Sequence, residues 1–260
     1  MHNSNLLEDK YMEIRTIGGG RRLCEAERVL CSGRCSGFDG RIILLPIPTS
    51  KDKKYITSTE RTIASILPLI LEGSLVVGYD IPKEISDRAT LVGALLYDGG
   101  LDEEFLIRNA VLTARGAIGY LLTAFDRDIS DMKIGIVGYG RIGSELLRLI
   151  LTLSSNVRVY TTRRSVAIEL GESGVEAEVV SEDSDFSDLN LLINTAPARQ
   201  ISLSRLPEDV GVIDLASGIN FDPSPRVIRL SSIPEAYYPI TAGRLYAGAV
   251  EKLLLSEGKI

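Results

Sequence analysis

The stretch that decides the fold is Lys133-Ile134-Gly135-Ile136-Val137-Gly138-Tyr139-Gly140-Arg141-Ile142-Gly143. A short apolar strand runs into the glycine pattern Gly-x-Gly-x-x-Gly, and a segment rich in Leu and Ile follows. In this context Gly138 allows a tight turn, Gly140 lets a pyrophosphate approach the backbone, and Gly143 lets helix and strand pack closely. Free N–H groups at the start of the helix favour phosphates. The pattern predicts a dinucleotide-binding site made of Gly138, Tyr139, Gly140, Arg141, Ile142 and Gly143. A glycine turn without a ligand is the alternative.

Outward from this turn, short apolar runs alternate with amphipathic stretches along the whole chain. Such alternation is typical of parallel sheets with crossover helices. The predicted fold class is therefore α/β with two domains, a C-terminal Rossmann-like doubly wound parallel sheet and a smaller N-terminal α/β domain. We expect residues 1–126 to form the N-terminal, substrate-side domain and residues 127–240 the Rossmann domain. The C-terminal helix, within 241–260, is a candidate to return to the first domain.

The same periodicity places the individual elements, with Ser32–Gly40 as a loop rich in Gly, Ser and Cys. Strands are predicted at Glu13–Ile17, Arg41–Leu45, Leu75–Gly78, Thr90–Leu95, Lys133–Val137, Val157–Thr161, Glu178–Val180, Leu191–Asn194, Val210–Leu215 and Val227–Leu230. Helices are predicted at Arg22–Leu30, Thr59–Leu71, Lys83–Arg88, Leu101–Phe125, Ile142–Leu153, Ser165–Ser173, Ser202–Leu206 and Thr241–Ser256.

The residues after the second Rossmann strand indicate which dinucleotide binds. An NAD site usually has Asp or Glu about 20 residues after the glycine turn, where it accepts from the ribose hydroxyls. This chain has Thr161-Thr162-Arg163-Arg164 there, without a carboxylate. Hydroxyl and guanidinium groups suit a 2′-phosphate. We therefore expect NADP as the cofactor, with NAD as the alternative. A purely structural interpretation is that both arginines are solvated residues at the start of a helix.

Two further strand ends carry polar residues. Ligands of open α/β sheets bind outside the carboxyl ends of strands. We therefore expect Asn194, Thr195, Ala196 and Pro197 to line the nicotinamide ribose. Asp214 and Ser217 are candidate catalytic residues that could bond to ribose, carboxamide or substrate, with ordinary turn chemistry as the alternative.

The segment that connects the domains carries two more candidate catalytic residues, Asn109 and Thr113. A helix there could present both side chains between the domains. The alternative is that this segment serves only helix packing, because Gly116 and its small neighbours would allow close contact between helices.

Composition excludes several classes of function. A net charge of -6 and a pI near 5.1 argue against binding to nucleic acid. No apolar run reaches the roughly 18 residues of a membrane span, and the polar start of the chain is unlike a signal peptide. We therefore expect a cytoplasmic protein without membrane or nucleic-acid partners.

Histidine and cysteine usage narrows the chemistry. The only histidine is His2, which excludes Ser-His-Asp hydrolysis and His-ligated zinc and argues against an ordinary hydroxy-acid dehydrogenase. Cys24, Cys31 and Cys35 have no obvious fourth ligand to complete a metal site, so free thiols and no metal are expected.

Five segments, in order along the chain, resemble the A subunit of bacterial dipicolinate synthase. They are Asn109–Ile118, the Gly138–Gly143 turn, Ile193–Ala198, Ile213–Ser217 and Thr241–Gly243. The resemblance is good from Leu101 to the C-terminus and loose over Glu13–Thr90. It implies an enzyme of sporulation that works in dipicolinic acid biosynthesis. Such an enzyme oxidises a dihydrodipicolinate-type ring, derived from a lysine-pathway intermediate, to dipicolinate, together with a flavoprotein-like B subunit.

The implied reaction suits a chain that is poor in histidine, because gain of aromaticity drives the loss of hydride and reduces the need for a strong base. A small dicarboxylate substrate needs cationic or N–H donors. Candidate cations are Arg108, Arg115, Arg199 and Arg244.

This chain departs from the family pattern at Gly20, where an acidic residue is common, at Arg115, where Glu is usual, and at Ile240, where Lys is usual. Two other functions therefore stay open. One is a dehydrogenase of another small carboxylate or imino acid. The other is a catalytically silent regulatory subunit that binds NADP(H). Oligomeric state stays open too, although a homo-oligomer is common among dehydrogenases of this architecture.

Overall fold

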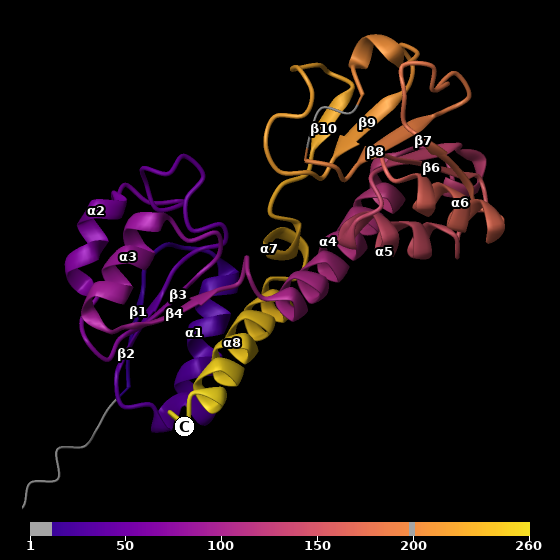
Figure 1. Cartoon of the computed structure of the whole chain (residues 1–260). Coiled ribbons are helices and arrows are strands. Elements are labelled where there is room, and N and C mark those ends of the chain that lie inside the picture. Colours follow the sequence, from indigo (N-terminus) through magenta and orange to yellow (C-terminus); the bar gives the residue numbers. More distant parts are fainter. Residues whose placement is uncertain (1–11, 198–200) are drawn as a thin grey trace, which may run out of the picture. The chain divides into compact units, whose positions relative to one another are not determined.

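A computed structural model describes residues 12–197 and 201–260. The chain divides into two compact units, one made of Met1–Arg108 and Pro239–Ile260, the other of Asn109–Tyr238 (Figure 1). The sequence predicts the division after residue 126, whereas it falls inside one continuous helix, α4 (Glu103–Ala124). The reason is packing: Ala114, Ala117 and Leu121 of α4 belong to the main hydrophobic core of the second unit.

The first unit is built on a parallel four-stranded sheet in the order β1-β2-β3-β4. The strands are β1 (Glu13–Thr16), β2 (Arg41–Leu44), β3 (Leu75–Gly78) and β4 (Leu95–Asp98). Residues of β2 and β3 are buried almost throughout, as expected for central parallel strands. One core of this unit gathers Ile43, Ile66, Val76 and Ile85 from the sheet and from the helices α2 (Ile63–Ile66) and α3 (Lys83–Val92).

The helices α1 (Arg21–Ser32) and α8 (Pro239–Ser256) pack against each other in the first unit. They approach closely at Gly243, where an added Cβ would lie 2.6 Å from the carbonyl oxygen of Arg22. Tyr246 of α8 is fully buried, and its hydroxyl donates to the carbonyl oxygen of Leu45 at 3.1 Å. The C-terminal helix thus belongs to the first unit in space although it follows the second in sequence.

The second unit contains a parallel six-stranded sheet in the order β10-β9-β8-β5-β6-β7. Its strands are β5 (Ile134–Val137), β6 (Val157–Thr161), β7 (Glu176–Val179), β8 (Leu191–Asn194), β9 (Gly211–Asp214) and β10 (Val227–Arg229). The strand order reverses between β5 and β8, which is the ligand-binding position in doubly wound folds. The predicted fold class is confirmed.

The two faces of this sheet are covered differently. Helices α4, α5 (Arg141–Ile150), α6 (Arg164–Glu172) and α7 (Ile233–Tyr237) pack on the face that carries Ile134, Val159 and Ile193. The opposite face, with Tyr160 and Leu192, is covered by residues from loops, among them Phe186 and Phe221. Figure 1 shows α4, α5 and α6 gathered beside this sheet.

Several predicted elements differ from the observed ones. Thr90–Leu95 is not a strand, because α3 continues to Val92 and ends at Gly93 in the left-handed conformation, and the strand starts at Leu95. The helix expected over Thr59–Leu71 is reduced to α2 and a 3-10 turn at Leu67–Leu69, which contains Pro68, a residue that interrupts an α-helix. The helix expected at Ser202–Leu206 is a short 3-10 turn, and the Ser32–Gly40 loop contains another at Arg34–Gly37. The short helix α7 was not expected.

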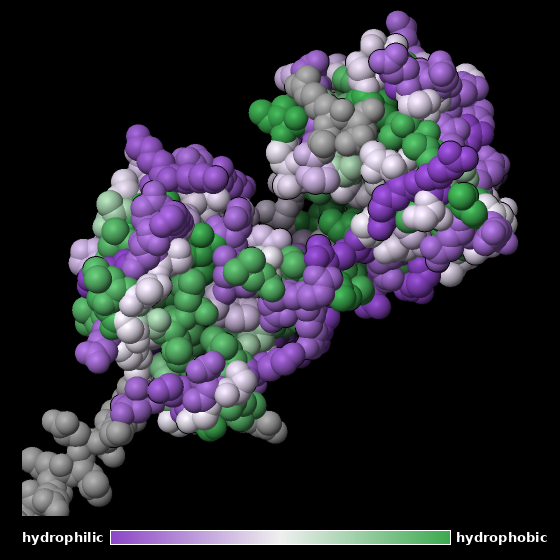
Figure 2. Space-filling model, in the orientation of Figure 1, coloured by the Kyte–Doolittle hydropathy of each residue, from purple (hydrophilic) through white to green (hydrophobic). Residues whose placement is uncertain are grey.

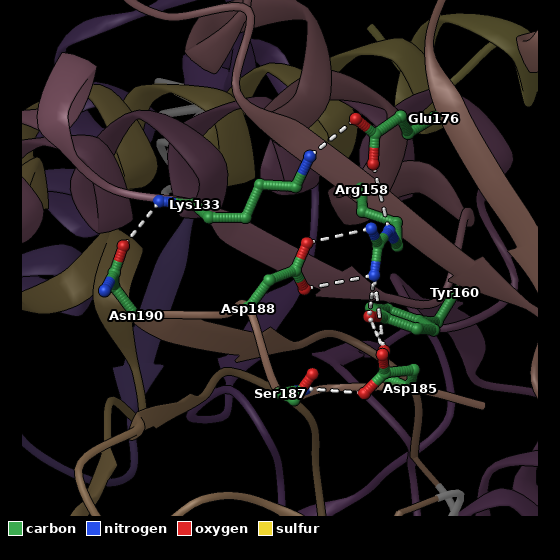
Figure 3. A network of polar contacts seen from close by, with 8 residues as sticks. All are labelled: Lys133, Arg158, Tyr160, Glu176, Asp185, Ser187, Asp188 and Asn190. Atoms are coloured by element: carbon green, nitrogen blue, oxygen red, sulfur yellow. Dashed lines mark hydrogen bonds and ion pairs between the residues drawn. The ribbon is translucent and has the colours of Figure 1, made fainter.

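An ion-pair network connects residues at the amino-terminal edge of the second sheet (Figure 3). Arg158 donates to Glu176 at 3.0 Å and, through both terminal nitrogens, to Asp188 at 2.9 and 3.1 Å. Lys133 pairs with the other oxygen of Glu176 at 2.6 Å. Burial raises the pKa of Tyr160 to about 12, so its hydroxyl is neutral and donates to the carbonyl oxygen of Asp185. These contacts join β6, β7 and the segment before β8 at this edge.

The surfaces of both units are mixed in character. On the face in view in Figure 2, hydrophobic side chains interrupt the hydrophilic surface of the first unit. Leu71, Leu91 and Leu101 are among its exposed hydrophobic residues. Across the described ranges, no helix combines the length and the apolar character that a membrane crossing needs.

Candidate functional site: the carboxyl edge of the second sheet

The glycine turn joins β5 to α5 at the reversal of strand order. Gly138 has a φ of +91°, in the region that favours glycine, and a Cβ there would lie 2.9 Å from Thr195 Oγ1. A Cβ at Gly143 would lie 2.2 Å from the carbonyl oxygen of Gly138. The fold itself therefore requires glycine at both positions.

Gly140 differs from the other two glycines. It caps the N-terminus of α5 with a φ of -96°, which any residue can adopt, and a Cβ there would meet no atom within 4 Å. The first N–H groups of a helix have no partner within the helix, and they can bind an anion. The fold itself therefore does not require glycine at this position, and the space beside Gly140 would allow the close approach of a pyrophosphate.

The loop after β8 is fastened to the glycine turn. Thr195 Oγ1 donates to the carbonyl oxygen of Val137 at 2.9 Å and lies 3.2 Å from that of Gly138. The Asn194 side chain is hydrogen-bonded to the backbone of its own loop. Its Nδ2 donates to the Ala196 carbonyl, and its Oδ1 accepts from the Ala196 N–H. Pro197 is exposed at the end of this loop. The structure thus brings the predicted Asn194–Pro197 segment to the glycine turn.

The residues after β6 form the other side of the turn. Thr161 is buried, whereas Thr162, Arg163 and Arg164 are exposed. The Arg163 guanidinium donates to the carbonyl oxygen of Tyr139, within the glycine turn. A cation therefore lies beside the turn at the position where an NAD site usually has a carboxylate.

Asp214 lies at the end of β9, and only 1% of its side chain is exposed. Its carboxylate accepts from Asn194 Nδ2 at 2.8 Å, from Asn220 Nδ2 at 3.2 Å and from the Ala216 N–H at 3.3 Å. Asn220 also donates to the carbonyl oxygens of Ala216 and Ser217. The Asp214 carboxylate thus holds the loops after β8 and β9 together, while Ser217 is exposed on the second loop.

Asn109 and Thr113 lie on α4, one turn apart. Thr113 is buried, and its hydroxyl donates to the carbonyl oxygen of Asn109 at 2.9 Å. No hydrogen bond within residues 12–197 and 201–260 links either side chain to the loops after β8 and β9. Gly116 serves helix packing, because a Cβ there would lie 2.2 Å from a methyl group of Ile233 in α7.

The four arginines that the sequence analysis names as candidate cations for a dicarboxylate substrate do not share one environment. Arg108 is exposed and lies 3.8 Å from Glu104, and Arg244 pairs with Glu25 at 3.0 Å. Arg115 is exposed on α4, and its charge contributes to the lowered pKa of Glu145, after the larger effect of Arg148. Arg199 lies outside the described residues.

Two site residues were missed from the sequence, Asn220 and Arg229. Asn220 lies in an ordinary-looking loop segment, and nothing local marks it as buried. Arg229 offered a signal, since a charged residue ends an otherwise apolar strand. The register aligns Asn194 with Asp214 and Asp214 with Arg229, so the three polar residues form one row across β8, β9 and β10.

Within the parts of the chain that the structure covers, no three His, Cys, Asp or Glu residues gather as a metal site would require. Cys24, Cys31 and Cys35 are free thiols, and burial raises the pKa of Cys35 to about 11.

Comparison with known proteins agrees with this geometry. Residues 120–219 match the NAD-binding domain of the D-isomer specific 2-hydroxyacid dehydrogenases. No curated protein sequence matches the chain.

Among solved structures, the A subunit of dipicolinate synthase from Bacillus halodurans is similar with a TM-score of 0.78 and 21% identity over 94% of this chain and 98% of that one. The A chain of dipicolinate synthase from Bacillus subtilis gives 0.73 and 19% over 95% and 96%. A D-isomer specific 2-hydroxyacid dehydrogenase from Lactobacillus delbrueckii, solved with NAD, gives 0.53 and 10% over 95% and 98%.

The resemblance predicted from the sequence motifs is therefore confirmed at the level of the fold. The glycine turn belongs to a domain of known NAD-binding type, and its fit to a pyrophosphate supports an NAD(P)-dependent oxidoreductase. The chain has the fold of the A subunit of dipicolinate synthase, and it includes a Rossmann-type nicotinamide dinucleotide-binding domain.

Proposed function

We propose that this protein is an NADP-dependent dehydrogenase that oxidises a dihydrodipicolinate-type ring, derived from a lysine-pathway intermediate, to dipicolinate. The observation that carries the cofactor part is Arg163, which donates to the glycine turn at Tyr139 where an NAD site would have a carboxylate. The similarity to the A subunit of dipicolinate synthase over 94% of the chain supports the substrate part.

The chemistry places modest demands on the protein. Bound NADP⁺ would supply the acceptor for a hydride from one ring carbon; with loss of a second ring hydrogen as a proton, the products would be the aromatic dicarboxylate and NADPH. Aromaticity drives this loss, so the chain's residues mainly bind and orient the reactants. The Gly138–Gly143 turn would hold the pyrophosphate, and Thr161–Arg164 the 2′-phosphate. Asn194–Pro197 would line the nicotinamide ribose.

The candidate catalytic residues keep distinct roles in this proposal. Ser217 is exposed and is the candidate to touch the carboxamide or the substrate. Asp214 is buried and would act by holding the two loops in place. Asn109 and Thr113 would act from α4, with Asn109 the more accessible of the two.

The cofactor proposal is tested by fluorescence titration with NADPH and NADH. The wild-type protein should bind NADPH at least about tenfold more tightly, since one charge-assisted hydrogen bond contributes roughly 1.5–3 kcal/mol. Arg163→Gln should remove most of this preference. Arg148→Gln removes the same charge from the exposed side of α5 and should keep the preference. Tighter binding of NADH by the wild-type protein would refute the proposal.

The substrate proposal is tested by incubation with the lysine-pathway intermediate and NADP⁺, with and without a B subunit of dipicolinate synthase. Formation of dipicolinate together with NADPH supports the proposal. Absence of dipicolinate in both mixtures contradicts it. A requirement for the B subunit would identify the flavoprotein-like partner that the resemblance implies. Gel filtration of the same samples reports whether the protein forms a homo-oligomer.

A second candidate function is a catalytically silent NADP(H)-binding subunit. The observation that favours it is Ile240, which is 48% exposed at the start of α8 where relatives usually have Lys. Tight NADPH binding, a stable complex with a partner and no turnover on a panel of small carboxylates and imino acids would support this function over both enzymes.

A further inference from the structure

Arg229 ends β10, the edge strand of the second sheet. It pairs in register with Asp214 of β9, which in turn pairs with Asn194 of β8. The residue therefore lies at the carboxyl-terminal edge, in the row that also carries the loops after β8 and β9. Parallel strands bring their carboxyl ends to one edge, where ligands of this fold bind.

The Arg229 guanidinium is anchored on one side and open on the other. One terminal nitrogen donates to the carbonyl oxygen of Phe221 at 2.6 Å, and Nε lies 3.9 Å from the buried carboxylate of Asp214. These contacts fix the direction of the side chain, yet 42% of it stays exposed. A guanidinium has five N–H donors, and in residues 12–197 and 201–260 only Phe221 accepts a hydrogen bond from this one.

Four other basic residues of the second unit have different contacts or positions. Lys133 and Arg158 belong to the network at the amino-terminal edge. Arg226 donates to carbonyl oxygens of Leu203 and Pro207. Arg163 follows β6, on the side of the glycine turn assigned above to the 2′-phosphate. Arg229 lies on the opposite side, beyond β8 and β9.

This placement matters because the two halves of a dinucleotide lie on either side of the strand reversal. If the 2′-phosphate binds beside β6, the nicotinamide half would extend over β8 and β9. A cation beyond β9 would then lie near the reacting end of the cofactor and away from its phosphates.

We propose that Arg229 binds a carboxylate group of the substrate at the nicotinamide end of the site. Planar guanidinium and carboxylate groups form paired hydrogen bonds, which also orient the bound molecule. The Phe221 carbonyl and Asp214 hold the guanidinium, and its exposed N–H groups receive the substrate. This inference rests on the proposed function, because it assigns the residue that recognises the carboxylate class of that substrate.

Titration calorimetry on the full chain saturated with NADPH tests the assignment. The probes are pyridine-2,6-dicarboxylate and its uncharged analogue, pyridine-2,6-dicarboxamide. Arg229→Gln should weaken dicarboxylate binding by about 10- to 100-fold, as expected for loss of charge-assisted hydrogen bonds. It should leave the affinity for NADPH and the weak binding of the dicarboxamide unchanged. Arg229→Lys keeps the charge without the paired geometry and should fall between Arg229→Gln and the wild type.

Arg127→Gln is the matched control, because it removes the same charge from an exposed position in the segment that precedes β5. It should bind the dicarboxylate like the wild type. If Arg229→Gln binds the dicarboxylate as tightly as the wild type, the inference is wrong while the substrate class stands. If it loses NADPH affinity and thermal stability in parallel, Arg229 merely supports Asp214, which also overturns the inference. If the wild-type protein with NADPH binds no dicarboxylate, the substrate part of the proposed function fails as well.

Discussion

Two glycines of the same turn should respond in opposite ways to the addition of one methyl group. At Gly140 the new Cβ would have no heavy atom within 4 Å, whereas at Gly143 it would lie 2.2 Å from the Gly138 carbonyl oxygen. Gly140→Ala should therefore preserve the fold and remove cofactor binding. Gly143→Ala should damage the fold directly.

The magnitudes follow from this geometry. Alanine at an N-cap is unfavourable, but it also lowers the entropy of the unfolded chain, so Gly140→Ala should change the free energy of unfolding by less than about 1 kcal/mol. A methyl carbon and a phosphate oxygen cannot approach as closely as the ~2.9 Å of a hydrogen bond. Displacing the pyrophosphate from even one amide would cost about 1.5–3 kcal/mol, or roughly 10- to 100-fold in Kd. Overpacking at Gly143 should cost about 1–3 kcal/mol and lower the Tm by roughly 2–12 °C.

The assay pairs thermal unfolding without cofactor with NADPH titration of the same samples. Gly140→Ala should unfold like the wild type and bind NADPH at least about tenfold more weakly. Gly143→Ala should unfold at a lower temperature. Unchanged NADPH affinity in Gly140→Ala would show that no pyrophosphate lies at this turn, and the assignment of the site would fail with it.

Three further predictions concern the residues that hold the second sheet together. Asn220→Ala should cost about 1–3 kcal/mol in urea unfolding, because the buried Asp214 carboxylate loses a donor, and an unchanged urea midpoint would contradict this role. Hydrogen bonds from Lys133 and Arg158 lower the pKa of Glu176 from its ordinary value of 4.5, so Glu176 stabilises the folded state above that pH and the effect is lost as the pH falls through the lowered value. The Tm of Glu176→Gln should consequently vary less than that of the wild type between about pH 5 and 3, and parallel curves would count against the network. Arg158→Met breaks the ion pairs with Glu176 and Asp188 and should reduce stability while NADPH affinity stays constant; a matching loss of NADPH affinity would mean that the amino-terminal edge also shapes the site.

Much of the fold was predictable because its signals are local. The strands Leu75–Gly78, Val157–Thr161 and Leu191–Asn194 have the predicted bounds, since most residues of each strand are buried and turn or loop residues flank it. The strand expected at Thr90–Leu95 was misplaced by a few residues, because Leu91 and Val92 look apolar yet belong to the last turn of a helix. Leu91 is 78% exposed, which no pattern of apolar residues could show.

The polar residues of the site were only partly predictable for a related reason. Asn194 and Asp214 end strands that are clear in the sequence, so both could be placed at the carboxyl-terminal edge of the sheet. Asn220 and Arg229 act through contacts with Asp214 across 6 and 15 positions of the chain, and such contacts depend on how a loop folds back. A local pattern cannot distinguish them from ordinary loop and strand-end residues.

The sequence alone determined the parallel α/β architecture, the glycine turn and the absence of a carboxylate after β6, because spacing and residue type act over a few neighbouring positions. Only the tertiary structure decided that a Cβ at Gly140 would meet open space, whereas one at Gly143 would meet backbone. The same holds for the burial of Asp214 and for the position of Arg229 in the row with Asn194 and Asp214. These properties depend on which atoms from distant segments meet, and that is fixed by the packing of the whole unit.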